Sequence, residues 1–217
     1  MKKTVRLAAL AAIAILTGTT LSAQVVETTN YDDGRVYIGQ RNGKGKIEGQ
    51  GMMTWPNGDR YEGQWKKGNQ EGEGTYTWAN GIVYQGQWVK NQIKGKGTFT
   101  FPSGDVMEGE WTDMGTGTGV YTWSDGTSYE GTFLNGAPHG QGIKIWPNGD
   151  RYEGAFIQGH MSGEGTCTYH NGASYTGSWL NDKYNGNGKY VGADGAVMEG
   201  TFRAGKCTNC KTNDDEE

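Results

Sequence analysis

The sequence predicts an all-β protein, an elongated, single-layer, twisted antiparallel sheet built from tandem β-hairpins as a repeat solenoid. Three observations predict this fold. A glycine with similar flanking residues recurs every 22 or 23 residues, apolar residues alternate with polar ones around it, and turn residues separate the alternating stretches. A repeat of about 20 to 50 residues marks stacked supersecondary units in place of a single globular core.

The first strand of each unit carries the pattern Tyr-x-Gly-x-Trp or a close variant. Alternate residues of a strand share one face, so Tyr84, Gly86 and Trp88 point to one side of the sheet and Gln85 points to the other. Every unit therefore has one apolar face. The pattern occupies residues 61–65, 84–88, 107–111, 129–133, 152–156, 175–179 and 198–202, with a degenerate first copy at 37–41.

The second strand begins at a Gly-x-Gly pair, which follows 10 to 12 residues after the start of each pattern. By the same alternation, Gly72, Gly74, Tyr76 and Trp78 fall on one face. Glycine weakens an isolated strand, so its recurrence needs a packing reason. We expect a ring from the neighbouring strand to cover each missing side chain. Lys144 replaces one of the second-strand aromatics, an irregularity that the sequence alone does not explain.

The turns between hairpin strands have their own signature. Residues 55–58 and 146–149 both read Trp-Pro-Asn-Gly, which places proline and glycine where a turn needs a fixed and a left-handed backbone angle. The other connection varies in length, so strand register is kept while one edge of loops varies. Some fifteen strands of about seven residues predict a sheet about 20 Å tall and about 70 Å long.

The Tyr-x-Gly-x-Trp opening and the Gly-x-Gly middle resemble the membrane occupation and recognition nexus (MORN) repeat over residues 31–205. The resemblance implies hairpins stacked edge to edge in an antiparallel sheet. It also implies a role as scaffold, dimerisation module or membrane-proximal adaptor, and lipid binding has been proposed for the family. We divide the chain into a leader (1–23), a lead-in with a half hairpin (24–36), a MORN array of about seven and a half units (37–205) and a tail (206–217).

The leader has the features of a signal peptide. A basic start precedes ten apolar residues at 7–16, and Leu21-Ser22-Ala23 offers a cleavage site. Ten apolar residues are too few to span a bilayer. We expect export to the periplasm or the outside of the cell, with a mature chain that begins at Gln24.

The charge of the chain restricts its partners. Removal of the three positive charges of the leader takes the net charge from -4 to -7. An acidic surface repels nucleic acid and anionic lipid headgroups, so we expect no nucleic-acid partner and disfavour a membrane surface. Proteins and uncharged glycans stay open as partners.

The three cysteines have different settings. Cys167 stands where Tyr76 and Phe99 stand in other units, which predicts a small buried residue. Cys207 and Cys210 leave three interpretations open: a disulfide that closes the terminal edge, half of a metal site, or a redox pair. An exported chain favours the disulfide, and a lone Cys-x-x-Cys is too weak to indicate zinc.

No set of residues in the sequence predicts catalysis, so we expect a protein that is not an enzyme. His139, His160 and His170 occupy three different places in their repeats, as polar loop residues do. No helix follows the Gly-x-Gly pairs to receive a phosphate. We therefore expect no metal and no cofactor.

The aromatic face remains as the candidate binding surface, because no helical stretch follows residue 23 to cover it. The sheet must curl over its own rings, pair with another copy, or leave a groove for a ligand. We favour a scaffold that binds a protein partner or itself through this face or its edges, and the alternative is a module for cell-envelope glycans or lipid headgroups. The predicted face, which is also structural, comprises Tyr61, Trp65, Tyr84, Trp88, Trp111, Tyr129, Phe133, Tyr152, Phe156, Tyr175 and Trp179.

Overall fold

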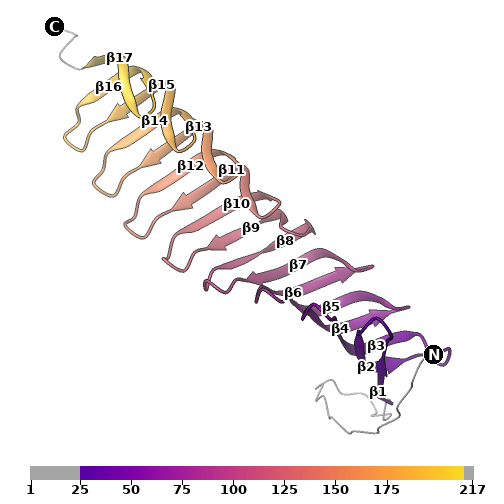
Figure 1. Cartoon of the computed structure of the whole chain (residues 1–217). Helices are drawn as coiled ribbons and strands as arrows, with labels where there is room; N and C mark the ends of the chain where they lie inside the picture. The colour runs from indigo at the N-terminus through magenta and orange to yellow at the C-terminus, as the bar shows by residue number, and fades with distance from the viewer. Residues whose placement is uncertain (1–24, 213–217) are drawn as a thin grey trace, which may run out of the picture. The chain divides into compact units, whose positions relative to one another are not determined.

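The computed structural model describes residues 25–212, and the predicted leader and acidic terminus lie outside these residues. The described residues form seventeen β-strands and no helix, which confirms the predicted all-β fold of antiparallel hairpins. The chain divides after Pro102 into two compact units, and each is described by itself. Figure 1 shows the succession of hairpins within each unit.

The first unit contains seven strands, and each strand pairs antiparallel with the next one along the chain. The strands are β1 (Glu27–Asn30), β2 (Val36–Arg41), β3 (Ile47–Thr54), β4 (Arg60–Lys66), β5 (Asn69–Thr77), β6 (Val83–Val89) and β7 (Gln92–Thr100).

The second unit contains ten strands with the same pairing rule. Its last strand lies after residue 205, in the tail, for which the sequence predicted no strand. The strands are β8 (Val106–Asp113), β9 (Thr116–Thr122), β10 (Ser128–Leu134), β11 (Ala137–Ile145), β12 (Arg151–Ile157), β13 (His160–Thr168), β14 (Ser174–Leu180), β15 (Lys183–Val191), β16 (Val197–Arg203) and β17 (Lys206–Thr212).

The turns have the predicted geometry. Gly58 has a φ of +94° and donates its N–H to the carbonyl of Trp55 at 3.0 Å. Gly149 repeats this arrangement with a φ of +91°. Glycine adopts this left-handed conformation at no steric cost, and it closes the turn that the Pro-Asn-Gly sequence predicts.

The Gly-x-Gly pairs correct one expectation. The register between β4 and β5 shifts between Gly63 and Trp65, and Gly72 lies in the resulting bulge with a φ of +71°. A Cβ on Gly72 would meet Gln64 on the polar face. We expected both glycines on the face of the rings. The first, Gly72, instead adopts the left-handed backbone conformation that the bulge requires, and only the second, Gly74, lies on the face of the rings.

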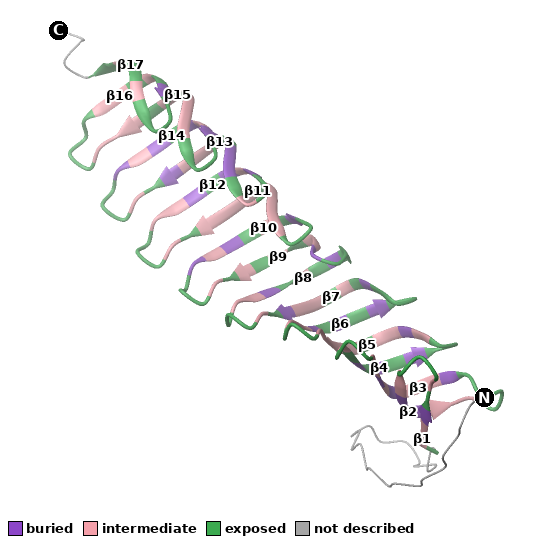
Figure 2. Cartoon of the chain, in the orientation of Figure 1, coloured by how far each residue is buried: buried purple, intermediate pink, exposed green. Residues whose placement is uncertain are grey.

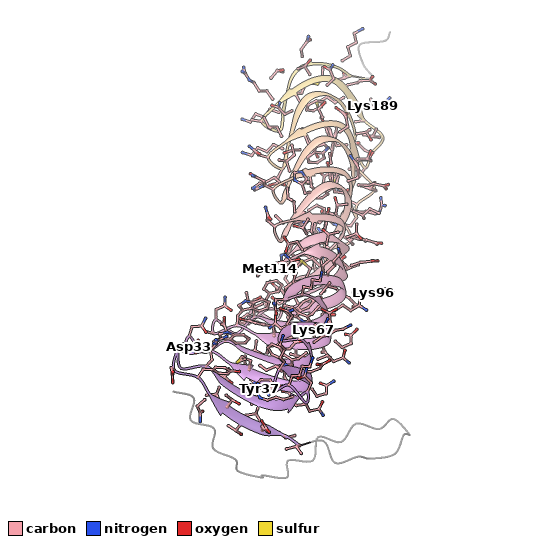
Figure 3. All side chains as sticks on the ribbon, turned by 90° about the vertical axis from the view of Figure 1, so that its right-hand side faces the viewer. Asp33, Tyr37, Lys67, Lys96, Met114 and Lys189 are labelled. Carbon is pink, nitrogen blue, oxygen red and sulfur yellow. A yellow bond between two sulfur atoms is a disulfide. The ribbon has the colours of Figure 1, made fainter. Side chains whose placement is uncertain are left out.

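The bulges recur and accompany a strong bend of the strands. Each register shift leaves extra residues on one strand, which increases the local bend and twist. Figure 3 shows strands bent into arcs with side chains packed on the inside, and Figure 2 shows buried and exposed positions alternating along the strands. The sheet therefore curls over its own rings within each unit, the first of the three possibilities left open by the sequence.

Candidate functional site

Tyrosine is the central residue of six of the eight copies of the pattern, and methionine replaces it in the other two. The ring of Tyr61 on β4 lies over Gly74 on β5, so a Cβ added to Gly74 would lie within 2.5 Å of its ring carbons. The Tyr61 hydroxyl donates a hydrogen bond to the carbonyl of Gln64 at 3.0 Å. The ring explains the glycine, and the hydrogen bond explains why the residue is tyrosine and not phenylalanine. The same bond, to the carbonyl three residues further on, is made by Tyr37, Tyr84, Tyr129, Tyr152 and Tyr175.

Tryptophan links some of the hairpins to the previous one. The Trp65 indole N–H donates to the carbonyl of Gly51 at 2.9 Å, and Trp179 does the same to Gly165 at 3.0 Å. Tyr61 packs edge-to-face against two such residues, at 5.0 Å from Trp65 and 5.3 Å from Trp88 between ring centroids. Edge-to-face pairs add about 0.5–1.5 kcal/mol beyond the area that they bury.

Burial changes the chemistry of these tyrosines. Desolvation raises the pKa of Tyr84, Tyr129 and Tyr175 to about 12 each. Burial penalises the charged phenolate, so the rings stay neutral and hydrogen-bonded at physiological pH. They are structural groups with no acid–base role there.

The predicted aromatic face forms a core and not an accessible surface. Its rings are at most 5% exposed because the bent sheet packs them against the neighbouring hairpins. A ligand that approached the folded chain would touch almost none of them. This holds for Tyr61, Trp65, Tyr84, Trp88, Trp111, Tyr129, Phe133, Tyr152, Phe156, Tyr175 and Trp179.

A second set of rings is only half-buried, and we name it the turn-edge row. Its members stand six residues after the first glycine of six of the seven Gly-x-Gly pairs, immediately before a turn, a spacing that the sequence already contained. Trp55 and Tyr76 lie 5.6 Å apart between ring centroids, and Tyr76 and Trp78 lie 4.6 Å apart. The row consists of Trp55, Trp78 and Phe101 in the first unit and Trp123, Trp146 and Tyr169 in the second.

Carboxylates tie the turns of successive repeats together beside this row. Asp59 accepts hydrogen bonds from the Tyr76 hydroxyl at 2.8 Å and from the backbone N–H of Ala79 at 2.9 Å. Asp105 accepts the same two bonds from Tyr121 and Ser124. Burial alone would raise the pKa of Asp59, but these donors outweigh it and hold the pKa below its usual value.

Lys144, the irregular residue, is half-buried between two indoles of the row. Its Nζ lies 5.1 Å from the ring centroid of Trp123 and 5.0 Å from that of Trp146. An ammonium over an indole face is attracted by the ring quadrupole. Desolvation lowers the pKa of Lys144, while Asp182 and Asp125 oppose the shift.

A cavity of about 510 Å³ opens in the second unit beside Cys167. Cys167 is buried and has a free thiol, as its place in the repeat predicts. Rings from the turn-edge row and from the core form walls of the cavity, and two carboxylates reach it. The lining comprises Trp146, Pro147, Asn148, Asp150, Met161, Cys167, Tyr169, Trp179, Asp182, Lys183, Tyr184 and Gly205.

The two remaining cysteines lie on the terminal strand. The sulfur atoms of Cys207 and Cys210 are 1.96 Å apart, as a disulfide within β17. The described part of the chain holds no group of three or more histidine, cysteine or acidic residues arranged to bind a metal. Within residues 25–212, no helix is long and apolar enough to cross a membrane.

A comparison with protein-family models identifies the repeat. The MORN repeat model matches residues 44–60, 61–83, 84–106, 108–128, 129–151, 152–174 and 175–197. A comparison with curated proteins finds no match.

Among solved structures, the CPAP G-box domain is 13% identical, with 87% of this chain and 97% of that chain covered and a TM-score of 0.49. The TCP domain of Drosophila melanogaster SAS-4, solved with a proline-rich motif of Ana2, is 14% identical, with 78% and 95% covered and a TM-score of 0.43.

Proposed function

Because this chain belongs to the MORN repeat family, we propose that it is a non-enzymatic, exported scaffold that binds a protein partner through the turn-edge row. The observation that carries the proposal is the contrast between two sets of rings. The rings of the predicted aromatic face, here called the ladder, are buried in the chain itself. Trp55, Trp78 and Phe101, with their counterparts in the second unit, keep part of their surface accessible.

The row suits protein recognition for two physical reasons. Tryptophan, tyrosine and phenylalanine are enriched in protein interfaces, where one large ring buries much area at a small entropic cost. The rings are also held in place before binding, since Trp78 packs on Tyr76 and Asp59 fixes the hydroxyl of Tyr76. Preorganised rings lose less freedom when a partner binds.

Charge and the leader sequence support the other parts of the proposal. A mature net charge of -7 favours neutral or basic partners over nucleic acid and anionic headgroups. The signal-peptide pattern of residues 1–23 supports export to the periplasm or the outside.

The test is affinity capture from native extract with three forms of the mature protein. We expect Trp78→Ala and Trp123→Ala each to lose the captured partner, while Gln85→Ala, on the exposed polar face of β6, retains it. Circular dichroism checks that all forms are folded, and light scattering gives the mass of the free protein. Equal capture by Trp78→Ala and Gln85→Ala would place the interface elsewhere. Retention on envelope polysaccharide by a monomer would favour the glycan alternative.

A further inference from the structure

The cavity beside Cys167 arises from a substitution within the repeat. The fourth residue after the first glycine of each Gly-x-Gly pair, here called the ring position, is aromatic in four units. Those residues are Tyr76, Phe99, Tyr121 and Tyr190. At Cys167 a small thiol stands at the ring position, and it lines the cavity of about 510 Å³. Small-molecule sites typically have volumes of about 300–1,000 Å³.

The strands around Cys167 match those around Tyr76. Cys167 pairs with Tyr152 on one side and with Tyr175 on the other. Tyr76 likewise lies between two ladder tyrosines, one on each neighbouring strand. The frame that holds a tyrosine ring is therefore kept at Cys167, although the ring itself is absent.

A carboxylate marks the same place. Asp59 accepts the hydroxyl of Tyr76, and Asp150 holds the equivalent position relative to Cys167. The backbone contact is conserved between these repeats: Asp150 Oδ1 accepts the N–H of His170 at 2.9 Å, as Asp59 Oδ1 accepts that of Ala79.

The second oxygen of Asp150 differs from that of Asp59. Asp59 Oδ2 accepts bonds from the Tyr76 hydroxyl and the Asn57 amide. Among the described residues, Asp150 Oδ2 accepts a bond from the Asn148 amide at 3.0 Å and none from a ring, because the thiol of Cys167 replaces the phenol. Asp150 Oδ1 also contacts His170 Nδ1 at 2.9 Å. The cavity thus contains a carboxylate without its usual ring-borne donor.

The charge of the cavity indicates which ligands could supply both an aromatic ring and a hydrogen-bond donor to Asp150. Asp150 and Asp182 line the cavity with Lys183 as the single basic lining residue, so the lining carries a net negative charge. Trp146, Tyr169 and Trp179 present faces that attract cations. Lys144, with its Nζ 5.0 Å from the Trp146 ring centroid, is an ammonium already held by one of these rings.

We propose that this cavity binds a small aromatic amine, whose ring takes the place of the missing tyrosine ring and whose ammonium group lies against Asp150. The cavity shares Trp146 and Tyr169 with the turn-edge row, but amine binding is measured directly and does not depend on a protein partner. A protein that fails to capture a partner would still bind the amine, and the reverse also holds.

The test uses three soluble probes of the same shape: phenethylammonium, phenethyl alcohol and phenylacetate. Calorimetry and quenching of tryptophan fluorescence measure binding to the mature chain. We expect phenethylammonium to bind at least about tenfold more tightly than phenylacetate, a difference of about 1.4 kcal/mol, with the alcohol between them. We expect a dissociation constant in the millimolar range or below. The absence of any binding at phenethylammonium concentrations up to about 10 mM would therefore overturn the proposal. Equal binding of phenylacetate would overturn it too.

Three variants locate the site. Cys167→Tyr restores the ring and should lose at least about tenfold in affinity for phenethylammonium, with a thermal midpoint equal to or above that of the wild type. Cys167→Ala keeps the cavity open and should bind as the wild type does. Asp150→Asn should weaken phenethylammonium binding and leave phenethyl alcohol binding unchanged. Wild-type affinity in a folded Cys167→Tyr protein would show that the amine binds elsewhere.

Discussion

Gly74→Ala tests the packing of tyrosine over glycine most specifically. A Cβ at residue 74 would lie 2.3 Å from the Tyr61 hydroxyl oxygen and 2.5 Å from two ring carbons. Ordinary contact between such atoms begins near 3.4 Å, so the ring must move by about 1 Å, a displacement that overpacked sites accommodate only with strain. The ring has little freedom, because its hydroxyl is bonded to Gln64 and its edges contact Trp65 and Trp88.

The cost can be estimated from these contacts. Overpacking of a well-packed site costs about 1–3 kcal/mol, and loss of the bond to Gln64 adds about 0.5–1.5 kcal/mol. We therefore expect Gly74→Ala to destabilise its part of the first unit by about 1.5–4.5 kcal/mol. Hydrogen exchange of the β4, β5 and β6 amides measures this cost, because long repeat arrays depart from two-state unfolding.

Two controls make the estimate specific. Gly43→Ala adds a methyl group where no atom lies within 4 Å, so we expect it to be neutral or slightly stabilising. In a Tyr61→Ala background the methyl group at residue 74 has room, and its cost should fall to less than about 0.5 kcal/mol if the two residues act as a coupled pair. A Gly74→Ala protein as stable as Gly43→Ala would refute the packing argument, and so would an undiminished cost in the Tyr61→Ala background.

Three further predictions concern the array and its ends. Deletion of residues 152–174, one full repeat, should leave a folded protein of unchanged circular dichroism per residue, because stability depends on neighbouring repeats; global unfolding would indicate a single indivisible core. Cys210→Ser removes a disulfide that closes a very short loop, so the free energy of opening of β17, measured by hydrogen exchange, should fall by at most about 2 kcal/mol. A loss of protection that extends as far as β12 would contradict a local effect. Mass spectrometry of the exported protein should find Gln24 at its N-terminus, and retention of the leader would argue against cleavage.

Much of the fold follows from the sequence, because the repeat of 22 or 23 residues and the two-residue alternation of the strands are both visible there. The 22- or 23-residue repeat predicts the hairpins, and the alternation around Gly86 predicts which face is buried. The turn at Trp55 to Gly58 was predicted in conformation as well as position. These features depend on local backbone rules, so a single sequence is enough to find them.

Which rings stay accessible was not predictable in the same way. Alternation assigns Trp65 and Trp78 to one face, but it does not say which of them the bent sheet covers. The bend comes from bulges at residues such as Gly72, whose positive φ the sequence pattern did not reveal. Burial by curvature depends on contacts between neighbouring hairpins, and it separates the buried ladder from the half-buried turn-edge row.

The importance of Cys167 and Lys144 also depends on neighbours in space. The sequence identified both as departures from the repeat, yet the consequence of each appears only beside other repeats. Lys144 fits because Trp123 and Trp146 lie on either side of it. A cavity lies beside Cys167 because Asp150 and two ladder tyrosines are placed as they are around an aromatic ring in other repeats, whereas Cys167 has no ring.

Alkaline titration tests the central claim, that buried neutral tyrosines form the core of each repeat. Burial raises the pKa of Tyr84 from 10.0 to about 12, so the folded state favours the protonated phenol. Its contribution to stability is complete below about pH 10 and is lost as the pH rises toward about 12, at up to about 1.4 kcal/mol per pH unit for each such tyrosine. A free energy of unfolding that is constant to about pH 10 and then falls, less steeply in Tyr84→Phe, is the predicted result. Ladder phenols that ionise near pH 10 in a protein of unchanged stability would contradict the account.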